Sequence, residues 1–242
     1  MNVKEILMKV LIFGNGYLGN KFLSALGDSA ILSGTDICDE KAVRADIREN
    51  SPDTVLNCAG KTGKPNVDWC EDHKLETMKS NVIGPLNLCQ VCSDEGTYMA
   101  HLGSGCVYEG DNNGKGFSED DAPNFFGSYY SRTKMLSEMG LKDFPVLQLR
   151  LRMPLDSEPS PRNLITKLAG YTKIIDAPNS ISALDDFVPA SIKLIERKRT
   201  GIYNVTNHLN PLDVYNNVTS PNYGHLAGPQ HRTFEPFLDL VY

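Results

Sequence analysis

The feature that most constrains the fold is a glycine-rich turn between an apolar segment and an amphipathic one. Residues 9–13 (KVLIF) form an apolar run of the kind found in strands buried on both faces of a parallel sheet, and apolar residues at helical spacing follow up to residue 26. A Gly-x-Gly-x-x-Gly turn in this context favours dinucleotide binding over a purely structural turn, because the backbone can approach a pyrophosphate at the helix N-terminus. The expected cofactor contacts here are Gly14, Gly16, Tyr17, Leu18 and Gly19.

Strand-like and helix-like segments alternate over the first 152 residues. This rhythm predicts an α/β fold, a Rossmann-like doubly wound parallel sheet, as an NAD(P)-binding domain at 1–152. The expected strands are 30–33, 54–58, 97–102 and 146–151, and the expected helices are 40–49, 75–92 (interrupted by Pro85) and 130–141, with a polar loop at 113–124.

Prolines break the alternation after Arg152. Helices are expected at 163–171 and 184–198, followed by a short strand at 201–205. We therefore expect residues 153–242 to form a small C-terminal substrate-binding lobe, in which 207–242 is irregular because Pro, Asn and Gly are frequent and periodicity is weak.

Composition excludes several classes of partner. The 242 residues carry a formal net charge of −6, which makes a general nucleic-acid or anionic-membrane binder unexpected. No apolar run is long enough to span a membrane and no signal peptide is evident, so a cytoplasmic location is expected. The six cysteines show no disulfide framework, and no metal site is expected. Cys89 and Cys92 form a CxxC within a helical pattern, which favours packing over zinc or redox chemistry.

Tyr130 and Lys134 are the sharpest candidates for chemistry. Four residues apart at the start of a predicted helix, they share one face, and an ammonium near a phenol favours the phenolate needed for proton transfer. An exposed Tyr–Lys pair is the simpler interpretation of this common spacing. The glycine turn and Ser104, which follows the preceding predicted strand, favour the catalytic one.

Two further loops are expected on the cofactor side. Asp36 lies 17 positions beyond Gly19, where a carboxylate can bind the ribose 2′-hydroxyl and repel a 2′-phosphate; a turn or cap aspartate is the equal alternative. The turn containing Cys58, Ala59 and Gly60 follows a predicted strand, at the edge where ligands bind in such sheets.

Longer motifs carry a resemblance to a known family. Together the segments resemble the extended short-chain dehydrogenase/reductase superfamily, and within it the nucleotide-rhamnose synthase 3,5-epimerase/4-reductase family, which is similar to the dTDP-4-dehydrorhamnose reductases. The resemblance covers residues 10–207. Its motifs are GKPNVDWCE at 63–71, GCVY at 105–108, PNF at 123–125, LRLRMP at 149–154, PRNLITK at 161–167 and GIYN at 201–204.

The resemblance implies a bifunctional enzyme. It would epimerise C3 and C5 and then reduce C4 of a nucleotide-4-keto-6-deoxyhexose, UDP-linked by family placement, to a nucleotide-L-rhamnose. Ser104, Tyr130 and Lys134 would form the reductase triad, and Cys106 and Lys167 would serve the epimerisation; without the family context, a buried cysteine and a surface lysine are the simpler interpretations. Further implied contacts are Asn81 to the cofactor, and Asn66, Trp69, Arg162 and Asn163 to the substrate.

Three departures bear on these expectations. The glycine turn is one residue shorter than the family's GxxGxxG. Asp36 stands where the family tends to have a basic residue, which leaves NADH open as the cofactor beside NADPH. The segment after Asn207 does not resemble the family. A 4-keto reductase without epimerase activity and a non-catalytic regulatory subunit are the alternative functions. Neither the choice between UDP and dTDP nor a homodimer is decided by the sequence.

Overall fold

The computed structural model describes residues 8–170 and 179–209, and these form two compact units. Of the described residues, 8–150 and 191–204 belong to the first unit, and 151–170, 179–190 and 205–209 belong to the second. Residues 191–204, which the sequence placed in the C-terminal lobe, therefore lie in the first unit. The first boundary falls between Arg150 and Leu151, two residues before the predicted one.

A six-stranded parallel sheet is the centre of the first unit. Its strand order is β2-β1-β3-β4-β5-β8, and every neighbouring pair is parallel, which confirms the predicted doubly wound α/β class. The chain order reverses beside β1, so ligands are expected at the carboxyl ends of the strands near this point. The strands are β1 (Val10–Phe13), β2 (Ala30–Ser33), β3 (Thr54–Asn57), β4 (Tyr98–Leu102), β5 (Val146–Arg150) and β8 (Gly201–Asn204).

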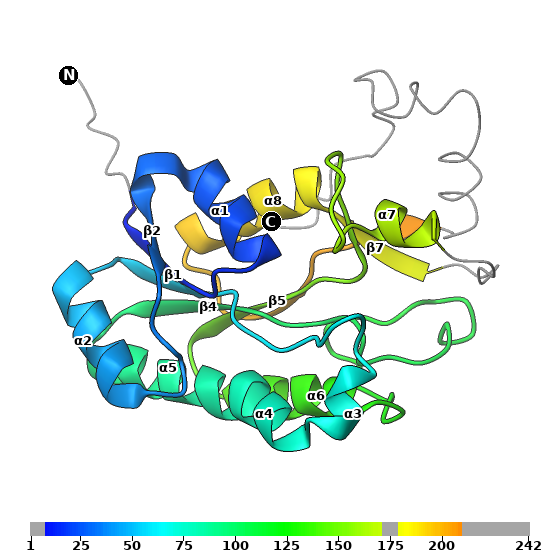
Figure 1. The fold of residues 1–242 in the computed structure, drawn as a ribbon, viewed down its shortest axis with the longest axis horizontal. Helices are drawn as coiled ribbons and strands as arrows, with labels where there is room; N and C mark the ends of the chain where they lie inside the picture. Colours follow the sequence, from blue (N-terminus) through cyan, green and yellow to red (C-terminus); the bar gives the residue numbers. More distant parts are fainter. Residues whose placement is uncertain (1–7, 171–178, 210–242) are drawn as a thin grey trace. The chain divides into compact units, whose positions relative to one another are not determined.

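Helices cover both faces of this sheet. α1 and the C-terminal part of α8 lie on one face, and α2, α5 and α6 lie on the other (Figure 1). The helical elements are α1 (Tyr17–Leu26), the short turn η1 (Gly27–Ser29), α2 (Glu40–Asn50), α3 (Trp69–Asp72), α4 (Lys74–Met78), the π-helical turn η2 (Lys79–Ile83), α5 (Gly84–Asp94), α6 (Tyr129–Leu141) and α8 (Leu184–Glu196).

The sequence predicted that Pro85 interrupts the helical segment, and this prediction is wrong. The backbone passes from α4 through η2 into α5, and Pro85 lies in the first turn of α5. Proline is tolerated in a first turn because its missing N–H is not needed there, and the change of hydrogen-bond register occurs in the preceding π-helical turn. This turn matters for the site because it contains Asn81.

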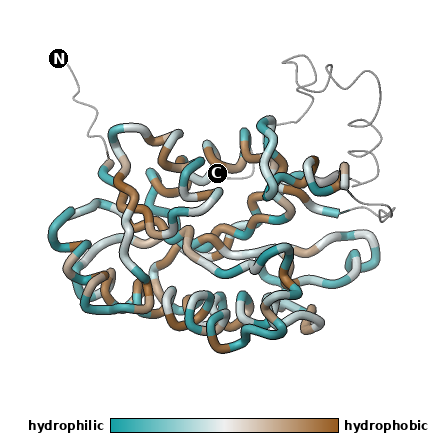
Figure 2. The backbone as a smooth tube through the Cα atoms, in the orientation of Figure 1, coloured by the Kyte–Doolittle hydropathy of each residue, from teal (hydrophilic) through white to brown (hydrophobic). Residues whose placement is uncertain are grey.

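The apolar core explains why these segments form a sheet. All four residues of β1 are fully buried, and the central strands are the hydrophobic part of the backbone in Figure 2. Cys89 and Cys92 belong to the cluster beneath β3 and β4, which confirms that the CxxC serves helix packing. Burial raises the pKa of both thiols, which makes them unreactive.

The second unit contains a small three-stranded sheet that the sequence did not predict. Its order is β6-β7-β9, with β6 and β7 parallel and β7 and β9 antiparallel. The strands are β6 (Pro154–Leu155), β7 (Asn179–Ala183) and β9 (Asn207–Leu209), and the helix α7 (Leu164–Leu168) packs with Ile181 into a small apolar core.

The expectation that residues 207–242 are irregular is wrong for their first three residues, which form β9; residues 210–242 lie outside the described part of the chain. Among the described residues, no helix is both long and apolar enough to cross a membrane.

Candidate functional site

The glycine turn after β1 is shaped to let two backbones meet. Gly14 has φ +107°, and a Cβ there would lie 2.4 Å from the Ala59 nitrogen; a Cβ on Gly19 would lie 2.1 Å from the Gly14 oxygen. At Gly16, by contrast, a Cβ would meet nothing within 4 Å. The first and third glycines are thus required by packing, whereas the second faces open space at the N-terminus of α1, where no side chain caps the helix.

The loop after β3, which was also predicted to contact a cofactor, lies against this glycine turn. Asn57 ends the strand, and its Oδ1 accepts a hydrogen bond from the Ala59 N–H at 2.9 Å. Cys58 and Ala59 lie directly against Gly14, while Gly60 is exposed. The structure therefore brings together the two cofactor loops that the sequence identified separately.

Asn81 of η2 is bonded to the loop that follows Gly60. Its Oδ1 accepts from the Lys61 N–H at 2.7 Å, and its Nδ2 donates to the Lys61 oxygen at 2.9 Å and to Thr133 Oγ1 at 3.1 Å. The side chain is 1% exposed. The amide therefore holds the loop after Gly60 against α6, and the cofactor contact expected for Asn81 stays a prediction.

Asp36 lies exposed three residues beyond β2. Its Oδ1 accepts from the Cys38 N–H at 2.9 Å, which is the turn-forming role that the sequence left open. A carboxylate has further acceptor capacity, so this bond leaves room for a ribose hydroxyl. Both interpretations of Asp36 are therefore compatible with the structure.

The start of α6 places Tyr130 and Lys134 on one face. Ser128 caps the helix by accepting from the Ser131 N–H, and Tyr130 is half-buried. Lys134 is 6% exposed, and its Nζ donates to the Leu102 oxygen at 2.9 Å. Burial lowers the pKa of Lys134 to about 8, so a cation is held in a low-dielectric position at the carboxyl end of β4.

Ser104 and Cys106 lie on the loop after β4, beside this lysine. The Ser104 hydroxyl is buried and accepts from the Cys106 N–H at 3.1 Å. Burial lowers the pKa of Lys134, and the negative charge of Glu138 opposes that effect. The loop that carries this hydroxyl and this thiol thus begins beside the Leu102 carbonyl that binds the Lys134 ammonium. This set can bind a carbonyl oxygen and move protons.

A buried ion pair that sequence reasoning missed supports the same loop. Arg150 Nε and Nη2 donate to the two oxygens of Glu138, each at 2.7 Å, and Nη1 donates to Asn204 Oδ1 at 3.2 Å. The guanidinium lies 5.1 Å from the centre of the Tyr108 ring, two residues after Cys106. No local pattern announces these partners, since 12 and 54 positions separate Arg150 from Glu138 and Asn204.

The expected substrate residues fall into two groups. Trp69, half-buried at the start of α3, stacks on His73 with ring centroids 3.7 Å apart, and Asn66 is exposed in the turn before it. Arg162 and Lys167 are half-buried in the second unit, with Lys167 in α7.

Asn163 is corrected to a structural role in the second unit. It is 2% exposed, and its Nδ2 donates to the backbone carbonyl oxygens of Asp156 and Glu158, both at 2.8 Å. Its Oδ1 accepts from the N–H groups of Asp156 and Ile165, which caps α7. These bonds use the amide fully, so no donor remains for a diphosphate.

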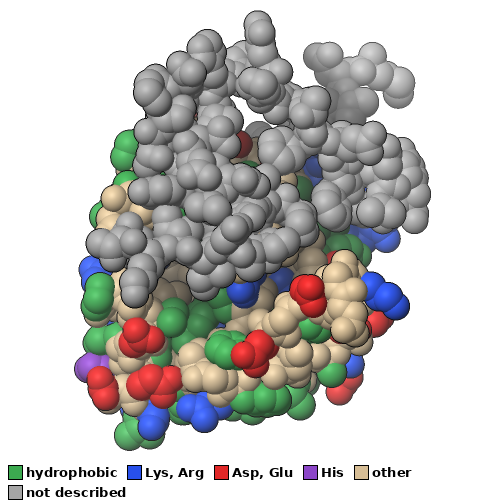
Figure 3. Space-filling view, turned by 90° about the vertical axis from the view of Figure 1, so that its right-hand side faces the viewer, with side chains coloured by type: hydrophobic (Ala, Val, Ile, Leu, Met, Phe, Trp, Pro, Cys, Tyr) green, Lys and Arg blue, Asp and Glu red, His purple; other side chains and the backbone are tan. Residues whose placement is uncertain are grey.

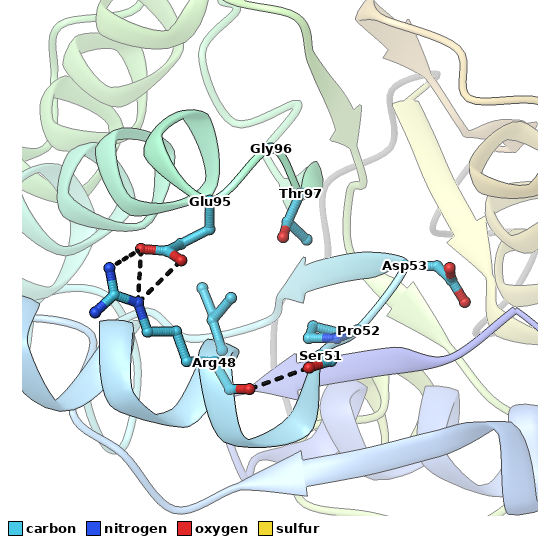
Figure 4. Close-up of a pocket in the computed structure, with 8 residues that line it drawn as sticks. Arg48, Ser51, Pro52, Asp53, Glu95, Gly96 and Thr97 are labelled. Carbon is cyan, nitrogen blue, oxygen red and sulfur yellow. Dashed lines mark hydrogen bonds and ion pairs between the residues drawn. The ribbon is translucent and has the colours of Figure 1, made fainter.

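A separate cavity of about 430 Å³ lies at the opposite edge of the sheet (Figure 4). It is lined by Arg48 and residues 51–53, which precede β3, and by residues 95–97, which precede β4. Arg48 Nε donates to both oxygens of Glu95 there. Its polar groups are paired at the amino ends of the strands, so this cavity is distinct from the candidate site.

Comparison with known proteins agrees with this geometry. The family model described as the RmlD substrate binding domain matches residues 8–153. A bifunctional dTDP-4-dehydrorhamnose 3,5-epimerase/dTDP-4-dehydrorhamnose reductase of Arabidopsis thaliana is 42% identical over 229 residues, covering 88% of this chain and 76% of that protein.

Two further relatives extend the comparison. A trifunctional UDP-glucose 4,6-dehydratase/UDP-4-keto-6-deoxy-D-glucose 3,5-epimerase/UDP-4-keto-L-rhamnose-reductase of the same plant is 42% identical over 89% of this chain, which spans only 35% of that protein. The crystal structure of the L780 UDP-rhamnose synthase from Acanthamoeba polyphaga mimivirus superposes with a TM-score of 0.83 at 36% identity, covering 89% of this chain and 82% of that one. These matches confirm the resemblance drawn from the motifs, and the chain belongs to the RmlD substrate binding domain family, alongside rhamnose epimerase/reductases.

Proposed function

We propose that this chain is a bifunctional sugar-nucleotide enzyme. It epimerises C3 and C5 of a nucleotide-4-keto-6-deoxyhexose, in the UDP form, and reduces C4 to give a nucleotide-L-rhamnose. The observation that carries this proposal is the buried Lys134 beside Ser104 and Cys106 at the carboxyl ends of the parallel strands. The relatives named for both half-reactions support the same chemistry.

A nicotinamide dinucleotide, NADPH or NADH, fits the residues present. A Cβ would close the approach between Gly14 and Ala59, whereas Gly16 leaves open space at an uncapped helix N-terminus. When bound, the cofactor supplies the hydride for C4. Gly14, Gly16 and Gly19 would hold its pyrophosphate, with Tyr17, Leu18 and the turn of Cys58, Ala59 and Gly60 along its sides, and Asp36 would meet the adenosine ribose.

Three residues would carry the reduction. Ser104 donates a hydrogen bond to the C4 carbonyl oxygen, and Tyr130 gives that oxygen its proton as C4 becomes an alcohol. Lys134 binds the nicotinamide ribose and stabilises the tyrosinate left behind. Because Lys134 is anchored to the Leu102 carbonyl, its ammonium is oriented before any ligand binds.

Two residues would serve epimerisation. The C4 carbonyl acidifies the C–H bonds at C3 and C5, so inversion requires one group to remove a proton and another to return one to the opposite face. We assign Cys106 and Lys167 to these acid/base roles, as the family resemblance implies. Asn66, Trp69 and Arg162 remain the proposed substrate contacts, because a guanidinium suits a diphosphate.

The decisive experiment incubates the purified chain with UDP-4-keto-6-deoxyglucose and NADPH or NADH in deuterated water. NMR should show deuterium at C3 and C5 and formation of UDP-rhamnose. Cys106→Ala should abolish exchange while the chain still reduces a 4-keto sugar that is already epimerised. If Cys106→Ala exchanges at the normal rate, the epimerase assignment fails and a reductase without epimerase activity remains.

We propose that the chain forms a homodimer through the face of the first unit that carries η2, α5 and α6. Large apolar side chains are exposed on η2, α5 and α6. Figure 3 shows apolar side chains along the lower edge of the molecule in that view. A second copy of the chain would cover them. Sedimentation of Met139→Lys with Leu136→Lys should give a monomer; an unchanged sedimentation coefficient would exclude this face. The exposed residues concerned are Ile83, Leu86, Leu136 and Met139.

A further inference from the structure

A buried polar row crosses the sheet on one face. Asn57 of β3 is the register partner of His101 of β4, which is in turn the partner of Gln148 of β5. Directly opposed residues point to the same face, and none of the three is more than 1% exposed. Polar side chains in a sheet centre oppose folding unless they are hydrogen-bonded, so this row calls for an explanation beyond packing.

His101 joins two functional elements through this row. The Asn57 amide accepts from Ala59 N–H, and its Nδ2 lies 3.0 Å from His101 Nδ1. On the other side of the ring, His101 Nε2 lies 3.4 Å from Ser137 Oγ, on α6. The chain of contacts therefore runs from the loop against Gly14 to the helix that carries Tyr130 and Lys134.

The hydrogen bonds determine the state of the imidazole. Because Asn57 Oδ1 is occupied by the Ala59 N–H, its Nδ2 faces His101, and Nδ1 of the ring must accept. The ring proton then sits on Nε2 and points at Ser137. Burial, and secondarily the charge of Lys134, lower the pKa of His101, so the ring stays neutral.

The surroundings make this neutral state important. Lys134 is bonded to the carbonyl of Leu102, the next residue after His101. The other charged groups on α6 and β5 are the exposed Arg132, which lies near Glu71, and the buried Glu138 and Arg150, which neutralise each other. A protonated His101 would oppose the Lys134 ammonium and lose the bond from Asn57, because both ring nitrogens would then be donors.

We propose that His101 is a positioning residue that sets the cofactor loop through Asn57 and the catalytic helix α6 through Ser137. The inference rests on the proposed function, since it assigns the two connected elements to cofactor binding and reduction. The two contacts use different ring nitrogens, so they can be removed one at a time.

Substitutions of His101 can remove its contact with Asn57 and its contact with Ser137 separately. Asn reproduces the position of Nδ1, so His101→Asn keeps the contact with Asn57; Gln reaches the position of Nε2, so His101→Gln keeps the contact with Ser137. His101→Leu removes both. Met99→Ala is the matched control, because Met99 is buried two positions earlier on the same face of β4 and takes no part in the hydrogen-bond chain.

The test measures dinucleotide affinity by fluorescence titration and kcat by substrate turnover, with stability as a third readout. We expect His101→Leu to lose up to about tenfold in both affinity and kcat, the equivalent of about one hydrogen bond for each. His101→Asn should recover affinity but not kcat, and His101→Gln should recover kcat but not affinity. Met99→Ala should lose stability with little change in either.

Each outcome bears on the inference. If affinity and kcat in the His101 variants fall only in proportion to stability, as in Met99→Ala, His101 is merely structural and the inference is overturned. If His101→Leu does not fold, His101→Asn and His101→Gln still give opposite patterns or refute the inference. If the unmodified chain turns over no sugar but binds dinucleotide, the proposed function fails, while the affinity difference between His101→Asn and His101→Gln still decides the role of His101.

Discussion

The buried pair of Glu138 and Arg150 offers a direct test of what holds α6, the helix of Tyr130 and Lys134, in place. The Arg150 side chain is 1% exposed and that of Glu138 is 7% exposed, and two parallel hydrogen bonds of 2.7 Å join them. Glu138→Gln keeps the size and shape of the side chain but removes its charge. The guanidinium is then left buried with Asn204 and the Tyr108 ring as its neutral partners.

The magnitude follows from burial. Two unit charges 4 Å apart attract by about 4 kcal/mol at an effective dielectric constant of 20, and breaking a buried pair by removing one partner costs about 3–5 kcal/mol. A loss of that size lowers the Tm of a chain of this length by roughly 6–20 °C. Glu138→Gln should therefore remove a large fraction of the free energy of unfolding, which is about 5–15 kcal/mol in ordinary domains.

Urea unfolding followed by circular dichroism measures the loss. Two controls separate charge burial from simple loss of contact. The double variant Glu138→Met with Arg150→Met should recover most of the stability, because no unpaired charge remains. Glu76→Gln breaks the exposed pair with Lys61 and should leave the transition unchanged, because solvent screens that pair. Equal losses in the single and double Glu138 variants would refute the reasoning.

Four further predictions concern the site. Gly14→Ala should abolish dinucleotide binding in a fluorescence titration, because its Cβ would lie 2.4 Å from the backbone nitrogen of Ala59. Gly16→Ala should fold normally, because its Cβ would meet nothing within 4 Å. Equal effects of the two substitutions on folding would contradict this geometry. The rate of reduction should fall as pH rises through about 8, where Lys134 loses its proton, and a flat profile to pH 10 would exclude a role for the ammonium. Because the pKa of His101 is lowered by folding, the unfolded chain binds more protons below its ordinary value of about 6.5, and stability should fall by up to about 1.4 kcal/mol per pH unit as pH decreases. His101→Gln should remove that component in urea titrations at pH 5 and 8. Asp36→Ser should increase NADPH affinity relative to NADH, and an unchanged ratio would assign Asp36 to the turn alone.

Much of the fold could be predicted because its signals are local. The apolar run before Gly14 forms β1, and every predicted strand of the main sheet is present with ends displaced by one residue or less. The second unit was harder. Strand β6 has only two residues, and three of the five residues of β7 are polar, so neither gives a strand signal. Asn163 looked like a ligand residue because the sequence does not show the hydrogen-bond partners of a helix cap.

The sequence by itself determined the class of sheet, the glycine turn and the Tyr130–Lys134 pair. These features depend on local patterns of residues that are close together in the sequence. Only the tertiary structure decided what surrounds them. Asn81 proved to be a bridge to α6, and His101 was not singled out at all. Their roles depend on partners 20 to 52 positions away, which strand pairing and the packing of helices on the sheet bring together. Hydrogen bonding and burial at these residues therefore come from the fold rather than from neighbouring residues.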